Sequence, residues 1–181
     1  MRILGIDPGS SVTGYGVVAR IGGGLEHVAS GTLRPPRKAS LPVRLHFVYR
    51  ALEEVIRHHR PDAAVVEQVF VANSARAALV LGQARGVALA ALAAADVGVS
   101  EYAATRIKQA VTGSGRAPKS QVQHMVRRLL ALDTTPASDA ADALAAAICH
   151  AHASRVAALG TEQRRARRPL RRALPRVSPA R

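Results

Sequence analysis

The chain has 181 residues and a formal net charge of +14, from 26 Lys and Arg against 12 Asp and Glu. That length suits one domain with a hydrophobic core and is too short for two large domains. The excess of positive charge favours a polyanionic partner, because basic surfaces attract nucleic acid by neutralising phosphates and releasing counterions. An anionic membrane surface would give the same electrostatic signal.

The cysteine content and the hydropathy pattern indicate in which cellular compartment the protein works. Cys149 is the single cysteine, so an intrachain disulfide is excluded and nothing indicates an oxidising compartment. The first residues show no signal-peptide pattern. The longest uninterrupted small and apolar stretch, residues 86–95, is too short to cross a bilayer. We therefore expect a soluble, cytoplasmic protein with no membrane partner.

The first third of the chain predicts three short strands. Residues 2–7 are a compact apolar run that ends at Pro8-Gly9, and two further strands follow over residues 14–20 and 25–33, separated by three glycines at 22–24. Strands in quick succession with tight turns form an antiparallel meander.

Alternating helices and strands follow the meander. Apolar residues at helical spacing predict a helix over residues 41–59, which Pro61-Asp62 ends. The remaining predicted elements are a strand at 63–66, a helix at 74–95, a strand at 97–102, helices at 105–111 and 119–132, and a last helix from 137 to about 158. This order predicts an α/β fold with a mixed five-stranded sheet flanked by helices on both faces.

The composition changes after Gly160. Residues 161–181 contain eight arginines, three prolines and the single acid Glu162. Such a segment has too little apolar surface to fold alone. We therefore expect a folded domain over residues 1–158 and a basic, mobile tail over residues 159–181.

Four carboxylates stand in apolar or small-residue surroundings, where an unpaired charge would be costly to bury. They are Asp7, Glu67, Asp139 and Asp142. If the strands that carry Asp7 and Glu67 are adjacent, the two acids meet at one edge of the sheet. Asp139 and Asp142 are three residues apart and project from one face of a helix.

Clustered acids repel one another and require a cation. In a basic chain, the natural cation is a divalent metal ion together with the phosphodiester that it activates, since two-metal hydrolysis needs several carboxylate ligands. The pattern therefore indicates a metal-dependent nuclease. Taken singly, Asp7 could be a turn residue, and Asp139 and Asp142 could be helix-capping acids. Glu67 is harder to explain in that way, because strands disfavour acids.

Several segments closely resemble the RuvC family of Holliday-junction endonucleases, in unbroken order from residue 1 to about 158. They are Leu-Gly-Ile-Asp-Pro-Gly (4–9), Thr-Gly-Tyr-Gly (13–16), Glu-Gln-Val-Phe (67–70), Leu-Gly-Gln-Ala-Arg-Gly (81–86), Lys-Ser-Gln-Val-Gln-His-Met-Val (119–126) and Asp-Ala-Ala-Asp-Ala-Leu-Ala (139–145).

The resemblance implies a ribonuclease-H-like fold and a homodimer that makes paired symmetric cuts in four-way DNA junctions during recombination and repair. It also implies two Mg²⁺ ions per site, with Mn²⁺ able to substitute, water as nucleophile, and nicks with 5′-phosphate and 3′-hydroxyl ends. By motif, Asp7, Glu67, Asp139 and Asp142 would be the catalytic, metal-binding acids. Some relatives carry histidine at the position of Asp139. A branch-migration motor, RuvA–RuvB, is the further partner that the family implies.

Four residues are candidates for DNA binding. The resemblance makes Lys108 and Lys119 phosphate contacts near the scissile bond, and Arg116 in the glycine-rich loop is a further candidate. Phe70 would by itself be a core or hinge aromatic, but the matching family residue is thought to stack near the crossover.

The helix at 74–95 also bears on assembly. It is rich in alanine, with Gly82 and Gly86 four residues apart, so another helix could approach it closely. It could be buried within one domain. A role between two subunits is favoured, because a symmetric dimer supplies two active sites.

Three other functions remain open at this level. Gly-Ile-Asp-Pro-Gly (5–9) also resembles a phosphate-binding turn of actin-like phosphotransferases, but the chain lacks the length for the second domain that such enzymes need. The second alternative is a junction-binding protein without catalysis, and the third is a related ribonuclease-H-like nuclease with another substrate.

Overall fold

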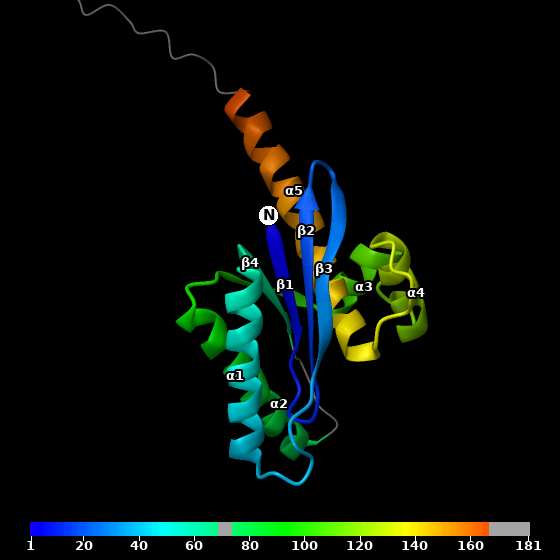
Figure 1. The fold of residues 1–181 in the computed structure, drawn as a ribbon. Helices are drawn as coiled ribbons and strands as arrows, with labels where there is room; N and C mark the ends of the chain where they lie inside the picture. The colour runs from blue at the N-terminus through cyan, green and yellow to red at the C-terminus, as the bar shows by residue number, and fades with distance from the viewer. Residues whose placement is uncertain (69–73, 167–181) are drawn as a thin grey trace, which may run out of the picture.

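The structure is a computed structural model that describes residues 1–68 and 74–166, with side chains as far as Ser154. Five strands form one sheet in the order β3-β2-β1-β4-β5 (Figure 1). They are β1 (Arg2–Asp7), β2 (Thr13–Ile21), β3 (Gly24–Leu33), β4 (Ala63–Gln68) and β5 (Val99–Ala103). β1, β2 and β3 pair antiparallel, whereas β4 runs parallel to both β1 and β5. The predicted meander and mixed sheet are confirmed.

Helices cover both faces of the sheet (Figure 1). One face packs against α1 (Leu41–His59) and α2 (Ala75–Ala94). The opposite face packs against α3 (Ala104–Thr112), α4 (Lys119–Leu129) and α5 (Ser138–Ala166). The fold therefore has three layers, as the alternation of strands and helices predicts.

Successive strand residues supply the two cores in turn, because side chains alternate across a sheet. Ile3 and Val65 are buried in the core beneath α3, α4 and α5. Leu4 and Val66 are buried in the core beneath α1 and α2. All four side chains are fully buried, and each such burial contributes about 1.5–3 kcal/mol to folding. With both faces covered, β1 and β4 have nearly continuous apolar sequences.

Glycines let α5 lie directly on the sheet. A Cβ atom at Gly5 would overlap the backbone carbonyl of Ala143, and one at Gly14 would overlap that of Asp139. Gly14 is the antiparallel partner of Asp7. This close approach therefore places the first turn of α5, with its acids, beside the end of β1.

The structure corrects the predicted surroundings of Glu67. The sequence predicts that the strand ends at residue 66 and that Glu67 lies just beyond it, but β4 continues to Gln68. The extension follows from pairing with β5, since Glu67 pairs with Tyr102 and Gln68 with Ala103. An acid is tolerated there because it lies at the open end of the strand, where it is only half-buried.

Two helix ends also differ from expectation. α4 ends at Leu129 rather than 132, because Ala131 adopts a left-handed conformation with φ 48°. α5 continues to Ala166, eight residues past its predicted end, so the start of the segment predicted to be a mobile tail is helical. Strong helix formers such as Glu162 and Gln163 offset the cost of about 1 kcal/mol for Gly160.

α2 is apolar but largely exposed in the single chain. Within the part of the chain that the structure describes, it is the one helix long and apolar enough to cross a membrane by length and composition, a property that core helices of soluble proteins share. Only 22% of its most apolar window is buried, and Leu79 is 69% exposed. The intramolecular contacts of α2 therefore leave most of its apolar surface uncovered.

Candidate active site

Asp7 and Glu67 lie side by side at the carboxyl ends of the neighbouring strands β1 and β4. The parallel register pairs Ile6 with Val66, which places the two acids one residue further along adjacent strands. Asp7 follows Ile3 and Gly5 on the face that contacts α5, and Glu67 follows Val65 on the same face. The predicted meeting of these carboxylates at the sheet edge is confirmed.

The first turn of α5 brings Asp139 and Asp142 to the same place. The contact of Gly14 with the backbone of Asp139 fixes the helix over β2, and both aspartates are close enough to raise the pKa of Asp7 by repulsion. The structure therefore brings together all four predicted acids, from β1, β4 and α5.

The electrostatics of Asp7 show how unfavourable this arrangement is without a cation. The pKa of Asp7 is raised from 3.8 to about 7, first by burial and then by repulsion from Asp142, Glu67 and Asp139. Lys119 opposes the shift only in part. Burial and the charge of Asp142 likewise raise the pKa of Glu67, against the influence of Lys108 and Lys119. The site is short of positive charge.

Lys119 supplies part of that charge. Its Nζ atom lies 2.7 Å from Oδ2 of Asp142, and this hydrogen bond raises the pKa of the lysine. Lys119 is the first residue of α4, so its ammonium group reaches the acids from a neighbouring helix. In the absence of a metal ion, this lysine is the counter-ion of Asp142.

A cavity of about 240 Å³ opens beside the acids. Its described lining includes Glu67 and Asp142 together with Lys108 and Lys119. The two lysines therefore lie at the acidic site, as the sequence predicts. Arg116 is exposed in the loop between α3 and α4 and is not among the described lining residues. Phe70 lies outside the described residues.

The chemistry of these side chains suits a hard divalent cation. Carboxylate oxygens are the ligands that Mg²⁺ prefers in proteins, and the raised pKa of Asp7 indicates a place where positive charge would be stabilising. The described residues contain no group of three carboxylate, imidazole or thiol side chains already close enough to hold an ion. The donor set therefore fits a metal, while the present side-chain positions favour the lysine.

The turn after Asp7 is braced by residues that the sequence does not single out. Thr13 is fully buried; its hydroxyl donates to the Gly9 carbonyl at 2.7 Å and accepts from the Gly9 amide at 3.2 Å. Arg44 of α1 donates to the Ser10 carbonyl at 2.6 Å. Thr13 stands in a motif of the resembled family, but its role as a brace becomes visible only in the fold.

The family model described as "Crossover junction endodeoxyribonuclease RuvC" matches residues 3–150, a span that includes all four acids. The chain belongs to the RuvC family. Its relatives include the RuvC of Alkalilimnicola ehrlichii, 59% identical over 83% of this chain and 91% of the relative. The RuvC of Bordetella parapertussis is 53% identical over 93% of this chain and 95% of the relative. Membership sets aside the actin-like interpretation of residues 5–9.

Solved structures agree with this assignment. RuvC of Thermus thermophilus in complex with a Holliday junction substrate matches with a TM-score of 0.82 and 34% identity, over 87% of this chain and 96% of the other. The yeast mitochondrial Holliday junction resolvase Ydc2 matches with a TM-score of 0.61 and 8% identity, over 89% of this chain and 85% of the other. At such low identity, the match shows a shared fold and nothing more. The ribonuclease-H-like fold predicted for this chain is confirmed.

Proposed function

We propose that this protein is a crossover junction endodeoxyribonuclease that resolves four-way DNA junctions by paired symmetric cuts. The observation that carries the proposal is the convergence of Asp7, Glu67, Asp139 and Asp142 at one sheet edge, in a chain with net charge +14. Membership of the RuvC family supports the junction as substrate. The products would be nicks with 5′-phosphate and 3′-hydroxyl ends, formed by water.

The four acids would hold two Mg²⁺ ions, with Mn²⁺ able to substitute. Bound ions of this kind lower the pKa of water and stabilise the leaving oxygen of an in-line displacement. Asp7 would have to be ionised to serve as a ligand, and its pKa of about 7 without metal shows that it binds a proton readily. Protons and metal ions should therefore compete for this carboxylate.

Lys108 and Lys119 would contact the phosphate beside the scissile bond. Both line the cavity that contains Glu67 and Asp142, and an ammonium group there can stabilise negative charge that develops on phosphate. Arg116, which is exposed in the neighbouring loop, would contact the backbone further away. Phe70 would stack on a base near the crossover; this role rests on the family motif at residues 67–70 and stays a prediction.

A homodimer would bury the exposed apolar surface of α2. Leu79, Gly82, Gly86 and Ala90 are exposed along the helix, and a Cβ at either glycine would meet nothing within 4 Å. A second copy of α2 could therefore pack closely against this surface. The ion pair between Arg85 of α2 and Glu101 suits a helix within a folded protein better than one in lipid. We expect cytoplasmic localisation and cooperation with the RuvA–RuvB motor.

A denaturing-gel assay on a synthetic four-way junction tests the proposed function. Wild-type protein with Mg²⁺ should give paired nicks at symmetric positions. EDTA should abolish these nicks because it removes the metal ions, and Asp7→Asn should abolish them because it removes a metal ligand. Junction binding should persist in both cases, since the basic surface is unchanged. Tight binding without cleavage across several crossover sequences, with Mn²⁺ also tested, would instead identify a junction-binding protein.

A further inference from the structure

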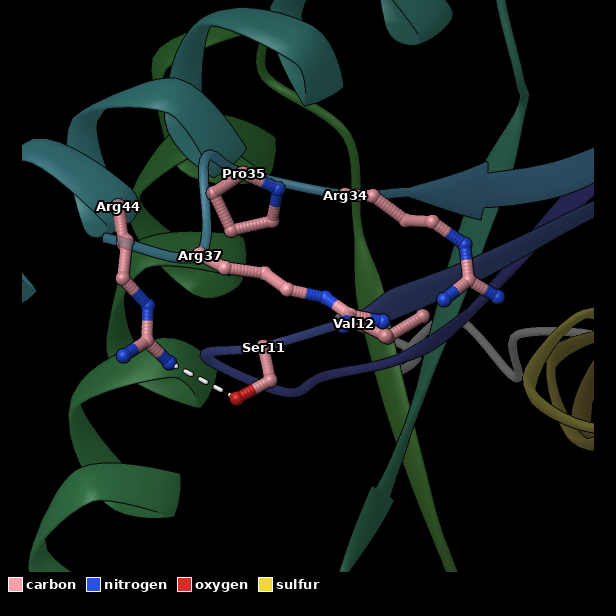
Figure 2. A pocket seen from close by; sticks show the side chains of 6 residues that line it. All are labelled: Ser11, Val12, Arg34, Pro35, Arg37 and Arg44. Carbon is pink, nitrogen blue, oxygen red and sulfur yellow. Dashed lines mark hydrogen bonds between the residues drawn. The ribbon is translucent and has the colours of Figure 1, made fainter. Parts of the chain in front are cut away.

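A basic site, separate from the acidic one, lies beside the turn that follows Asp7. A cavity of about 360 Å³ opens between the β1–β2 turn, the end of β3 and the start of α1 (Figure 2). Its described lining is Ser11, Val12, Arg34, Pro35, Arg37 and Arg44. Three arginines and no acid therefore face one hollow, a combination that is costly unless an anion enters it.

The charges of these arginines are not neutralised within the described chain. Its ion pairs between side chains involve other arginines and one lysine. Arg44 donates to the Ser10 carbonyl and to the hydroxyls of Ser10 and Ser11, the last at 2.9 Å, but these acceptors are neutral. Arg34 donates to the Thr32 hydroxyl at 3.3 Å, again a neutral partner. The cavity keeps its positive charge.

The cavity is built rather than formed by chance exposure. Arg44 is half-buried and fixed by its bonds to the turn, and Pro35 is buried. Figure 2 shows Arg44 bonded to Ser11 and Arg37 extending toward Val12. The Ser11 hydroxyl remains exposed and can donate to an oxygen of an anion. Guanidinium groups with a hydroxyl are the donors that recognise phosphate.

The position of the cavity connects it with the acidic site. Ser11 is four residues after Asp7, so the Cα atoms of these residues lie within about 14 Å of one another. That separation is less than half of one DNA helical turn of about 34 Å. A single DNA arm can therefore reach both sites.

We propose that Arg34, Arg37 and Ser11, oriented by Arg44, bind a backbone phosphate of the DNA substrate outside the cleavage site. This inference rests on the proposed function, because it takes DNA as the substrate. The site holds the arm that enters the active site and fixes its register relative to Asp7. It reads phosphate and not base sequence.

Binding of a fluorescent four-way junction in EDTA, measured by anisotropy at salt concentrations from about 50 to 200 mM, tests the proposal. The double variant R34A/R37A should bind about three- to tenfold more weakly at 100 mM salt, and the slope of log K against log salt should fall by about 0.9 for the phosphate lost. The matched control is R50A/R57A, which also removes two positive charges, from α1 residues that pair with Glu53 and Glu54.

A methylphosphonate scan of the junction locates the phosphate. Neutralising one particular phosphate should weaken wild-type binding but not further weaken R34A/R37A. If both double variants change the slope equally, or if every methylphosphonate effect adds to that of R34A/R37A, the proposal is overturned. Arg37-dependent binding of inorganic phosphate without any change in DNA affinity would also overturn it, by assigning the cavity to small phosphates. Failure of the wild type to cut or bind a junction would instead reject the proposed function.

Discussion

The ammonium group of Lys119 lies 2.7 Å from Oδ2 of Asp142 and joins the first turns of α4 and α5. The charge of Lys119 also opposes, in part, the rise in the pKa of Asp7 and of Glu67. In the metal-free protein, Lys119 thus neutralises only part of the negative charge of the carboxylate cluster. A metal ion would take over most of this role.

Replacement of Lys119 by methionine should therefore destabilise the metal-free protein more than the metal-bound one. Because the lysine is half exposed, we expect a loss of only about 0.5–1 kcal/mol in EDTA, and a smaller loss with saturating Mg²⁺. Junction cleavage should fall at least tenfold. Thermal melts with and without Mg²⁺ check the first expectation, with Lys38→Met as control. An equal loss in both buffers would contradict it.

Asp7→Asn should stabilise the metal-free protein at neutral pH. Since folding raises the pKa of Asp7 from 3.8 to about 7, the folded wild type holds this proton more tightly than the unfolded chain. Its stability therefore falls as pH rises between these values. At about 1.4 kcal/mol for each pH unit between these two values, the cost reaches about 4 kcal/mol above pH 7, which the neutral amide avoids.

The pH dependence separates this effect from a general gain in packing. In EDTA, the difference in unfolding free energy between Asp7→Asn and wild type should be small near pH 4, grow up to about pH 7, and then level off. Urea titrations at several pH values measure it. A difference that does not change with pH would show that Asp7 is not strained in the folded state.

Thr13→Val should damage catalysis through the turn that carries Asp7. The substitution removes the hydroxyl that bonds both polar groups of Gly9 and leaves these half-buried backbone groups without that partner, at a cost of about 1 kcal/mol. We expect kcat to fall about tenfold with little change in KM, because the acid is misplaced while the DNA contacts remain. Thr13→Ser keeps the hydroxyl and should restore most of the activity. If both variants cut equally well, the turn does not position Asp7.

Leu79→Arg should weaken the proposed dimer. Leu79 is 69% exposed in the single chain, and a charge in an apolar helix–helix contact is costly to desolvate. The dissociation constant of the dimer, from analytical ultracentrifugation, should rise at least tenfold. Ile21→Arg adds the same charge at a residue that is 58% exposed on the distant β2–β3 hairpin and should leave it unchanged. A monomeric wild type would reject this role of α2.

Phe70→Ala should leave duplex binding intact but reduce distortion of the junction, because the aromatic ring is proposed to stack on an unpaired base. The fluorescence of 2-aminopurine at the crossover reports this unstacking. Unchanged fluorescence in the variant would count against the proposed role.

The meander, the order of strands and helices, and the four acids could all be predicted from residue patterns along the chain. Alternation and helical spacing report local burial, and isolated carboxylates such as Glu67 stand out in apolar runs. Sequence patterns could not establish that β1 and β4 are neighbours, since their pairing joins residues about 60 positions apart. They also misplaced the ends of β4 and α5, where strand pairing and continued helix formation outweigh local signals.

Which charged groups meet follows from the packing of the whole fold. Lys119 pairs with Asp142 because α4 and α5 pack together. Arg34, Arg37 and Arg44 surround one cavity because the end of β3 and the start of α1 both lie beside the β1–β2 turn. Such contacts depend on how all the elements pack at once, and no local pattern of residues records them.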